Sequence, residues 1–116
     1  SPVSNFPAHA QYARKVVGNS VSNRIPDGFY AIFVRFDSFG GRIMPGDLVD
    51  CMRTRSGLCE HTVKVFDVDR LMTDSKELDR QVSIPLGHND DGTVVEIVGI
   101  AVGTYSPLMP GAFRTK

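Results

Sequence analysis

Two residues of this chain could act together as a nucleophile and its base, Ser20 and Lys64. Ser20 follows Gly18 at the end of an apolar stretch, and a polar turn comes next. We expect this placement to expose its hydroxyl at a rigid edge, where a nucleophile is useful. Lys64 lies between Val63 and Val65 in an expected strand, where partial burial disfavours the charged ammonium. A neutral lysine can accept the serine proton, so the pair could perform nucleophilic acyl chemistry.

Both residues also have an ordinary structural interpretation. A serine at this place can cap a turn, and a lysine in an edge strand can lay its stem along an apolar surface with its charge in water. Single serines and lysines are common, so the residue types alone favour this second interpretation. The chain has only four lysines, however, and Lys64 is the one with valine on both sides in a strong strand pattern.

The elements that must position these residues are expected to be strands. Runs of β-branched and aromatic residues alternate with turns of Gly, Pro, Asp and Ser. A Ser56-Gly57 turn is expected to join two strands into a hairpin, and Gly99 and Gly103 indicate a bend or bulge in the longest strand. The expected strands are 12–17, 29–36, 47–53, 59–66, 81–86 and 93–105.

The segment 67–80 is the one place where a helix is considered. Its apolar residues are only partly periodic, and Asp and Ser dominate the rest, so a helix and a loop with one helical turn are both open. The pattern as a whole predicts a mostly β domain, a small, coiled, partly closed β-barrel or sandwich. We expect residues 1–11 to be an irregular lead-in, the end of an upstream linker, and residues 12–116 to form one β domain.

Composition and charge limit the functions that fit. Apolar residues make up 41% of the 116 and charged residues 22%, which is typical of a soluble globular domain. Lys plus Arg and Asp plus Glu are equal at 13 each, whereas a domain that grips nucleic acid usually has a basic excess. No apolar run approaches the about 20 residues that cross a bilayer, and no signal peptide is visible. We expect a cytoplasmic protein without membrane contact, in which another segment makes any DNA contact.

Cysteine and metal chemistry are not expected to contribute. Cys51 and Cys59 are expected to be free thiols, because the chain shows no export signal. Cys59 and His61 form only one short pair of potential zinc ligands. The run from Asn89 to Gly92 resembles part of a calcium loop but lacks its distal Glu, so a hairpin turn is expected there. We therefore expect neither a metal nor a cofactor.

Five short motifs follow one another in a characteristic order. They are Gly18-Asn19-Ser20-Val21, Arg24-Ile25-Pro26-Asp27-Gly28-Phe29, Gly46-Asp47-Leu48-Val49, Thr62-Val63-Lys64 and Ile97-Val98-Gly99-Ile100-Ala101-Val102-Gly103. In this order they resemble the C-terminal domain of LexA-type and phage transcriptional repressors and its signal-peptidase-like relatives. The resemblance extends from about Tyr12 to Tyr105. Val21 departs from it, standing where the family has Met, and so does Phe29, where a second Asp is common.

The resemblance implies a fold, a reaction and a partner. The fold would be that of the LexA C-terminal domain, with Ser20 attacking a peptide bond and neutral Lys64 taking its proton. The backbone N–H groups of Asn19 and Ser20 would hold the developing oxyanion. The bond would lie in the protein's own chain, between a helix-turn-helix DNA-binding domain and this one. The same domain would form the homodimer that lets two DNA-binding domains bind a two-fold symmetric operator.

Three functions are open at this point. The first is the dimerisation and latent self-cleaving domain of a repressor, the second is a non-catalytic dimerisation module of the same fold, and the third is a trans-acting peptidase. The third fits least, because the chain has no membrane segment. The family cleaves Ala-Gly or Cys-Gly bonds and this sequence contains neither, so the target bond would lie outside it or be absent. The apolar segment 105–113 is expected to contribute a dimer contact.

Overall fold

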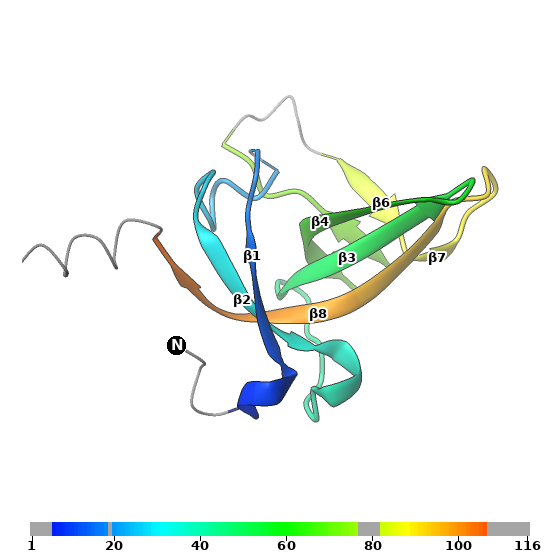
Figure 1. Cartoon of the computed structure of the whole chain (residues 1–116). Coiled ribbons are helices and arrows are strands. Elements are labelled where there is room, and N and C mark those ends of the chain that lie inside the picture. Colours follow the sequence, from blue (N-terminus) through cyan, green and yellow to red (C-terminus); the bar gives the residue numbers. More distant parts are fainter. Residues whose placement is uncertain (1–5, 19, 77–81, 107–116) are drawn as a thin grey trace, which may run out of the picture.

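A single antiparallel sheet forms the body of the molecule (Figure 1). The structure is a computed structural model that describes residues 6–18, 20–76 and 82–106. Within these ranges the sheet has eight strands and no α-helix accompanies it, which confirms the mostly β prediction. The strands are β1 (Gln11–Lys15), β2 (Tyr30–Arg35), β3 (Leu48–Arg55), β4 (Leu58–Asp67), β5 (Arg70–Met72), β6 (Ser83–Pro85), β7 (Gly87–His88) and β8 (Val94–Tyr105).

The order of strands leaves the sheet open. It runs β1-β2-β8-β3-β4-β5-β6, with β7 paired to β8 outside this path. β1 and β6 are the two ends of this path, and no pairing among the described residues joins them. The expected closure towards a barrel is therefore not reached in the described part of the chain. The sheet instead coils, so that β1 crosses β8 in the view of Figure 1.

β8 connects the two halves of the sheet. It pairs with β2 along its C-terminal half and with β3 along its N-terminal half. The register skips one residue in each ladder, because Asp50 pairs with Gly99 but Cys51 with Ile97, and Ile32 with Gly103 but Phe33 with Ala101. These irregularities lie beside the two glycines, as expected, and they bend β8 into the long curved strand of Figure 1.

The turn between β3 and β4 follows the sequence prediction. Ser56 and Gly57 both have positive φ, 51° and 79°, which is the backbone of a two-residue type I′ turn. Its twist matches that of the flanking strands, and the ladder runs without a break from Arg55–Leu58 to Leu48–Val65. This hairpin carries Lys64 at a fixed register opposite Val49.

The expectation of a helix or a helical turn over 67–80 is wrong for its described part. The chain reverses at Val68 and Asp69 and forms β5, which pairs with both β4 and β6. Val68 has a φ of 59°, a strained value for a β-branched residue, and its side chain is exposed. Leu71, one of the apolar residues of this segment, is a fully buried residue of β5. Residues 77–81 lie outside the described part of the chain.

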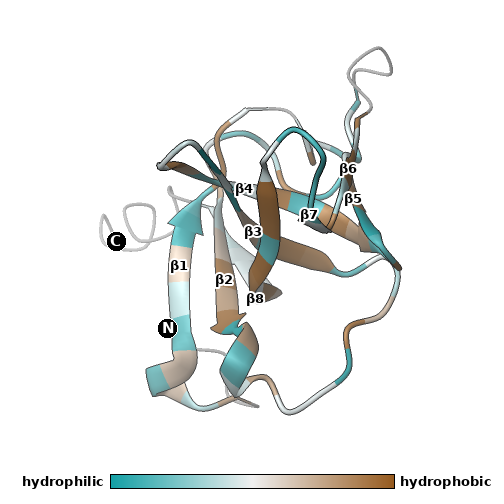
Figure 2. Cartoon of the chain, turned by 90° about the vertical axis from the view of Figure 1, so that its right-hand side faces the viewer, coloured by the Kyte–Doolittle hydropathy of each residue, from teal (hydrophilic) through white to brown (hydrophobic). Residues whose placement is uncertain are grey.

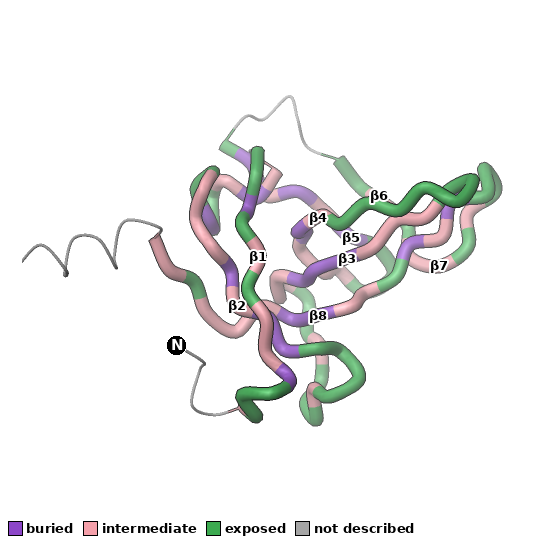
Figure 3. The backbone as a smooth tube through the Cα atoms, viewed as in Figure 1, coloured by how far each residue is buried: buried purple, intermediate pink, exposed green. Residues whose placement is uncertain are grey.

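Two apolar clusters stabilise the two halves of the sheet. One gathers Val21, Ile25, Phe33 and Val63, and the other gathers side chains from β3, β5 and β8: Val49, Cys51, Leu71, Val95 and Ile100. Figures 2 and 3 show apolar and buried positions along the central strands, with polar, exposed positions at the turns. Val21 and Ile25 are no more than 1% exposed although they lie in a loop, so the loop that precedes β2 is anchored in the core.

No helix in the described part of the chain has the length and apolar character that crossing a membrane requires. Both cysteines are free thiols in the structure, Cys51 buried and Cys59 exposed. The first regular element is a short 3-10 helix, Ala8–Ala10, and β1 begins directly after it.

Candidate active site

The loop between β1 and β2 carries Ser20. Its two ends are held together by backbone hydrogen bonds, from Val16 N to Phe29 O (2.8 Å) and from Gly28 N to Val16 O (2.7 Å). At the near end, Gly18 has a φ of 90° and its N–H donates to an Asp27 carboxylate oxygen at 2.8 Å. A glycine suits this position because other residues rarely adopt that backbone.

A tight turn follows Ser20 directly. The carbonyl oxygen of Val21 accepts from both Arg24 N (2.8 Å) and Ile25 N (2.9 Å), while the Val21 side chain is buried in the core. Ser20 is half-buried, and its hydroxyl donates to Val63 O at 3.4 Å. Val63 immediately precedes Lys64 in β4, so the turn places the serine beside the strand that carries the lysine.

Lys64 is buried in β4. It is 7% exposed, and its Nζ donates to Thr62 Oγ1 at 2.7 Å. Burial lowers the pKa of Lys64 below its usual value. The Arg53 charge acts in the same direction, whereas Cys51 and Glu60 act against it without reversing the shift. In the described part of the chain no ion pair involves Lys64. The neutral amine is therefore favoured here more than in water.

Cys51 is the thiol whose charge would matter most to Lys64. Burial raises the pKa of Cys51 to about 11, so it is a neutral thiol at physiological pH. A thiolate would hold a proton on the lysine, and a thiol does not. Burial thus shifts both groups towards their uncharged forms.

Ser20 and Lys64 line the same surface pocket. Its volume is about 480 Å³, and Val17, Gly18, Thr62, Thr73 and Val82 complete the lining. Each of the two functional groups is hydrogen-bonded to a different partner, the serine to a backbone carbonyl and the lysine to a threonine hydroxyl. A contact between the serine and the lysine would require these two hydrogen bonds to be exchanged. Asn19, expected to contribute to the oxyanion hole, lies outside the described residues.

A second polar cluster was not found by sequence reasoning. Asp50, only 1% exposed, accepts a hydrogen bond from the Tyr12 hydroxyl at 2.7 Å, with Arg14 Nε 3.8 Å and His61 Nδ1 3.5 Å away. Its Oδ1 has no hydrogen-bond partner among the described residues. Burial, and then the hydrogen bond to Asp50, raise the pKa of Tyr12. The sequence signal for this cluster was Asp50, a charged residue in the middle of an apolar strand.

The same cluster explains a glycine of β8. The Tyr12 ring passes over Gly99 on its way to Asp50, and a Cβ at Gly99 would overlap the Tyr12 hydroxyl. The ring also stacks on Phe33 at a centroid distance of 5.4 Å. Gly99 therefore serves two purposes, the bulge in β8 and the close passage of an aromatic side chain.

The segment that resembled a calcium loop is a hairpin turn, as expected. Gly92 N donates to Asn89 O at 3.0 Å, Asn89 N to Thr93 O at 2.9 Å, and Thr93 N to an Asp91 carboxylate oxygen at 2.9 Å. The turn joins β7 to β8. Across the described ranges, no three His, Cys, Asp or Glu residues come together as a metal site.

Comparison with known proteins adds no assignment: no protein-family model and no curated protein matches the chain.

Proposed function

We propose that this chain is the dimerisation and latent self-cleaving domain of a helix-turn-helix transcriptional repressor of the LexA type. The observation that carries the proposal is the pocket shared by Ser20 and Lys64. A hydroxyl is a weak nucleophile without a base, and a lysine is a base only when neutral. Burial of Lys64 favours that neutral form, and the motif order of the sequence supports the same pairing.

The proposed reaction needs few groups. The Ser20 oxygen attacks a peptide carbonyl carbon, and its proton passes to neutral Lys64 Nζ. The carbonyl oxygen becomes an oxyanion that the backbone N–H groups of Asn19 and Ser20 stabilise. When the C–N bond breaks, Lys64 returns the proton to the leaving amine. Water then hydrolyses the serine ester, with Lys64 again as the base.

Before the attack, two hydrogen bonds must be exchanged. The Ser20 hydroxyl leaves Val63 O and turns to Lys64 Nζ, which leaves Thr62 Oγ1. The first of these bonds is long, 3.4 Å, so its loss costs little. A latent site of this kind reacts slowly until a peptide occupies the pocket, which suits a repressor that is cleaved on demand.

The protein's own linker is the proposed substrate, and a second copy is the proposed partner. The chain has no excess of basic residues, so DNA contact is assigned to a helix-turn-helix domain upstream. Dimerisation through this domain would bring two such readers to a two-fold operator. Cleavage in the linker would separate the DNA-binding domains from the dimerisation domain, and the repressor would then release the DNA.

The experiment is self-cleavage of the full-length protein across alkaline pH, followed by gel electrophoresis and mass spectrometry of the fragments. Wild type is expected to be cut once, upstream of this domain. Ser20→Ala and Lys64→Ala should both stay intact, while Lys15→Ala, which changes an exposed lysine of β1, should be cut as wild type is. Cleavage that persists in Ser20→Ala would refute the proposed nucleophile.

A non-catalytic dimerisation module of the same fold is the second candidate. The observation that favours it is that the serine and the lysine each use another partner. Val21, where the family has Met, points the same way. Wild-type protein that dimerises and stays whole even at high pH would support this candidate and leave Ser20 and Lys64 without a reaction.

A further inference from the structure

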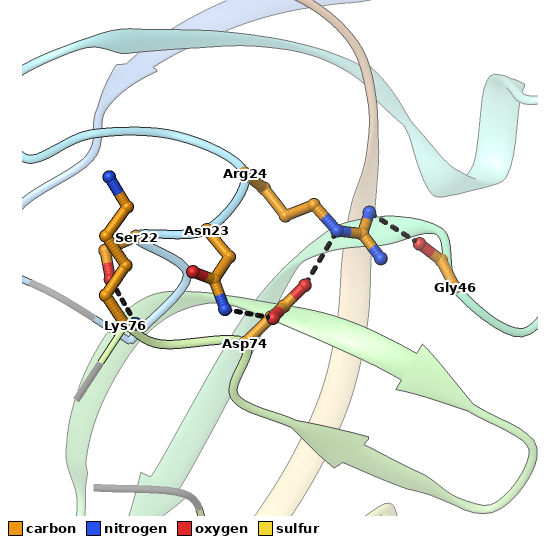
Figure 4. A network of polar contacts seen from close by, with 6 residues as sticks. All are labelled: Ser22, Asn23, Arg24, Gly46, Asp74 and Lys76. Atoms are coloured by element: carbon orange, nitrogen blue, oxygen red, sulfur yellow. Dashed lines mark hydrogen bonds and ion pairs between the residues drawn. The ribbon is translucent and has the colours of Figure 1, made fainter. Parts of the chain in front are cut away.

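A polar network on the outside of the Ser20 loop ties it to the segment that follows β5 (Figure 4). Two backbone hydrogen bonds join them, from Asp74 N to Ser20 O (2.7 Å) and from Asn23 N to Asp74 O (3.0 Å). The backbone of the proposed nucleophile is thus bonded directly to residue 74, far away in the sequence. Ser22 adds a third link, since its hydroxyl accepts from Lys76 N at 2.8 Å.

The side chain of Asp74 completes the network. One carboxylate oxygen accepts from Asn23 Nδ2 at 2.7 Å and the other from Arg24 Nε at 2.8 Å. Arg24 extends the chain of contacts, because its Nη1 donates to Gly46 O at 3.1 Å. The hydrogen bonds from Asn23 and then Arg24 lower the pKa of Asp74, so the carboxylate is ionised at neutral pH.

We propose that Asp74 is a positioning residue for Ser20, acting through Asn23 and Arg24. The loop is anchored on its inner side by the buried Val21 and on its outer side by this carboxylate. Between the two anchors the backbone of Ser20 is held beside the pocket, whose wall includes Thr73, the neighbour of Asp74. A nucleophile must be held to within a fraction of an ångström of its productive position, so loss of the outer anchor slows its reaction. The catalytic consequence rests on the function proposed above.

The position of the loop can be tested without any activity. Native-state hydrogen exchange of this chain should show the Asn23 and Ile25 amides exchanging about tenfold faster in Asp74→Ala than in wild type. Asp74→Asn should restore most of the protection, because its amide oxygen can accept from Arg24 and its NH2 can donate to a turned Asn23 amide. Asp69→Ala, which removes an exposed carboxylate paired with Arg70, is the matched control and should change nothing.

Reactivity of the serine is the second readout. The rate at which a fluorophosphonate labels Ser20 should fall about tenfold in Asp74→Ala and recover to within about threefold of wild type in Asp74→Asn. The pH at which labelling is half-maximal should not move, because Lys64 remains the base. Where Asp74→Ala does not fold, Asn23→Ala removes one of the two donors and takes its place in both measurements.

The outcomes separate the two proposals. If Asp74→Ala changes neither the amide exchange of the loop nor the labelling rate of Ser20, the positioning role of Asp74 is overturned. A shift in the pH of half-maximal labelling would overturn it too, because Asp74 would then act on the charge of Lys64. Faster loop exchange in Asp74→Ala together with no labelling of Ser20 in wild type would support the anchor while contradicting the proposed peptidase function.

Discussion

At the scale of single residues, the reactivity proposed for Ser20 depends on the charge of Lys64. An unperturbed lysine has a pKa near ~10.4 and is almost entirely protonated at neutral pH. Burial of Lys64 lowers its pKa, so the neutral fraction rises at lower pH than it would in water. The base is therefore created partly by the strand that buries it, and the serine needs only to be brought beside it.

The pH dependence of self-cleavage follows from the direction of this shift. Because only the neutral amine accepts the serine proton, the rate should rise about tenfold per pH unit below the lowered pKa of Lys64 and level off above it. Lys64→Arg should not restore activity to the site, since a guanidinium stays protonated throughout this range. Rates from gels of full-length protein between neutral pH and pH 10 measure this, with Lys15→Arg as control. A rate independent of pH would contradict a lysine base.

At the scale of elements, the two halves of the sheet meet where β1 crosses β8. Tyr12 of β1 reaches over Gly99 to the buried Asp50 of β3. One side chain thus connects three strands, and its phenol supplies the hydrogen bond to a carboxylate that is cut off from water. Tyr12 can pass this close to β8 only because Gly99 has no Cβ.

Gly99→Ala should therefore destabilise the domain by about 1–3 kcal/mol, because the added methyl group overlaps Tyr12 and cannot be accommodated without moving a strand. Gly40→Ala is the matched control, since a Cβ there meets nothing within 4 Å, and it should not lower the stability. Chemical denaturation measures both. In a double-mutant cycle, Tyr12→Phe should reduce the cost of Gly99→Ala, because it removes the atom nearest to the new methyl group. If Gly99→Ala and Gly40→Ala change the free energy of unfolding equally, the close passage of Tyr12 over Gly99 is contradicted.

At the scale of the whole molecule, the balanced charge is compatible with the proposed association of two copies. Lys plus Arg equal Asp plus Glu, so two copies can approach without strong repulsion. The segment expected to contribute a dimer contact, 105–113, lies almost entirely outside the described residues, so the interface stays a prediction.

The domain should sediment as a symmetric dimer at tens of micromolar, where a dissociation constant of ~10 μM corresponds to about −7 kcal/mol. Ser20→Ala and Lys64→Ala should not change this association, because both side chains line the pocket and neither is assigned to the interface. Analytical ultracentrifugation of wild type and the two variants gives the comparison. A strictly monomeric profile at these concentrations would argue against both candidate functions.

Most strands and turns could be predicted from the sequence because their signals are local. The Ser56-Gly57 turn needs only two residues that tolerate positive φ, and the bulges of β8 lie beside glycines that the sequence displays. β5 could not be predicted in this way, because its three residues are too few to show a period. Its pairing with β4 and β6 outweighs the weak helical pattern of the segment.

The sequence by itself determined the types of residue available at the candidate site, a serine after a glycine turn and a lysine between two valines. Only the tertiary structure decided which side chains meet. It placed Ser20 and Lys64 on one pocket, Tyr12 on Asp50, and Asp74 on Asn23 and Arg24. The hydrogen-bonded partners among these residues are 38 to 51 positions apart along the chain. A local pattern reports which face of a strand is buried, whereas contacts at such separations depend on the order of the strands and the coil of the sheet, which arise when the whole chain packs.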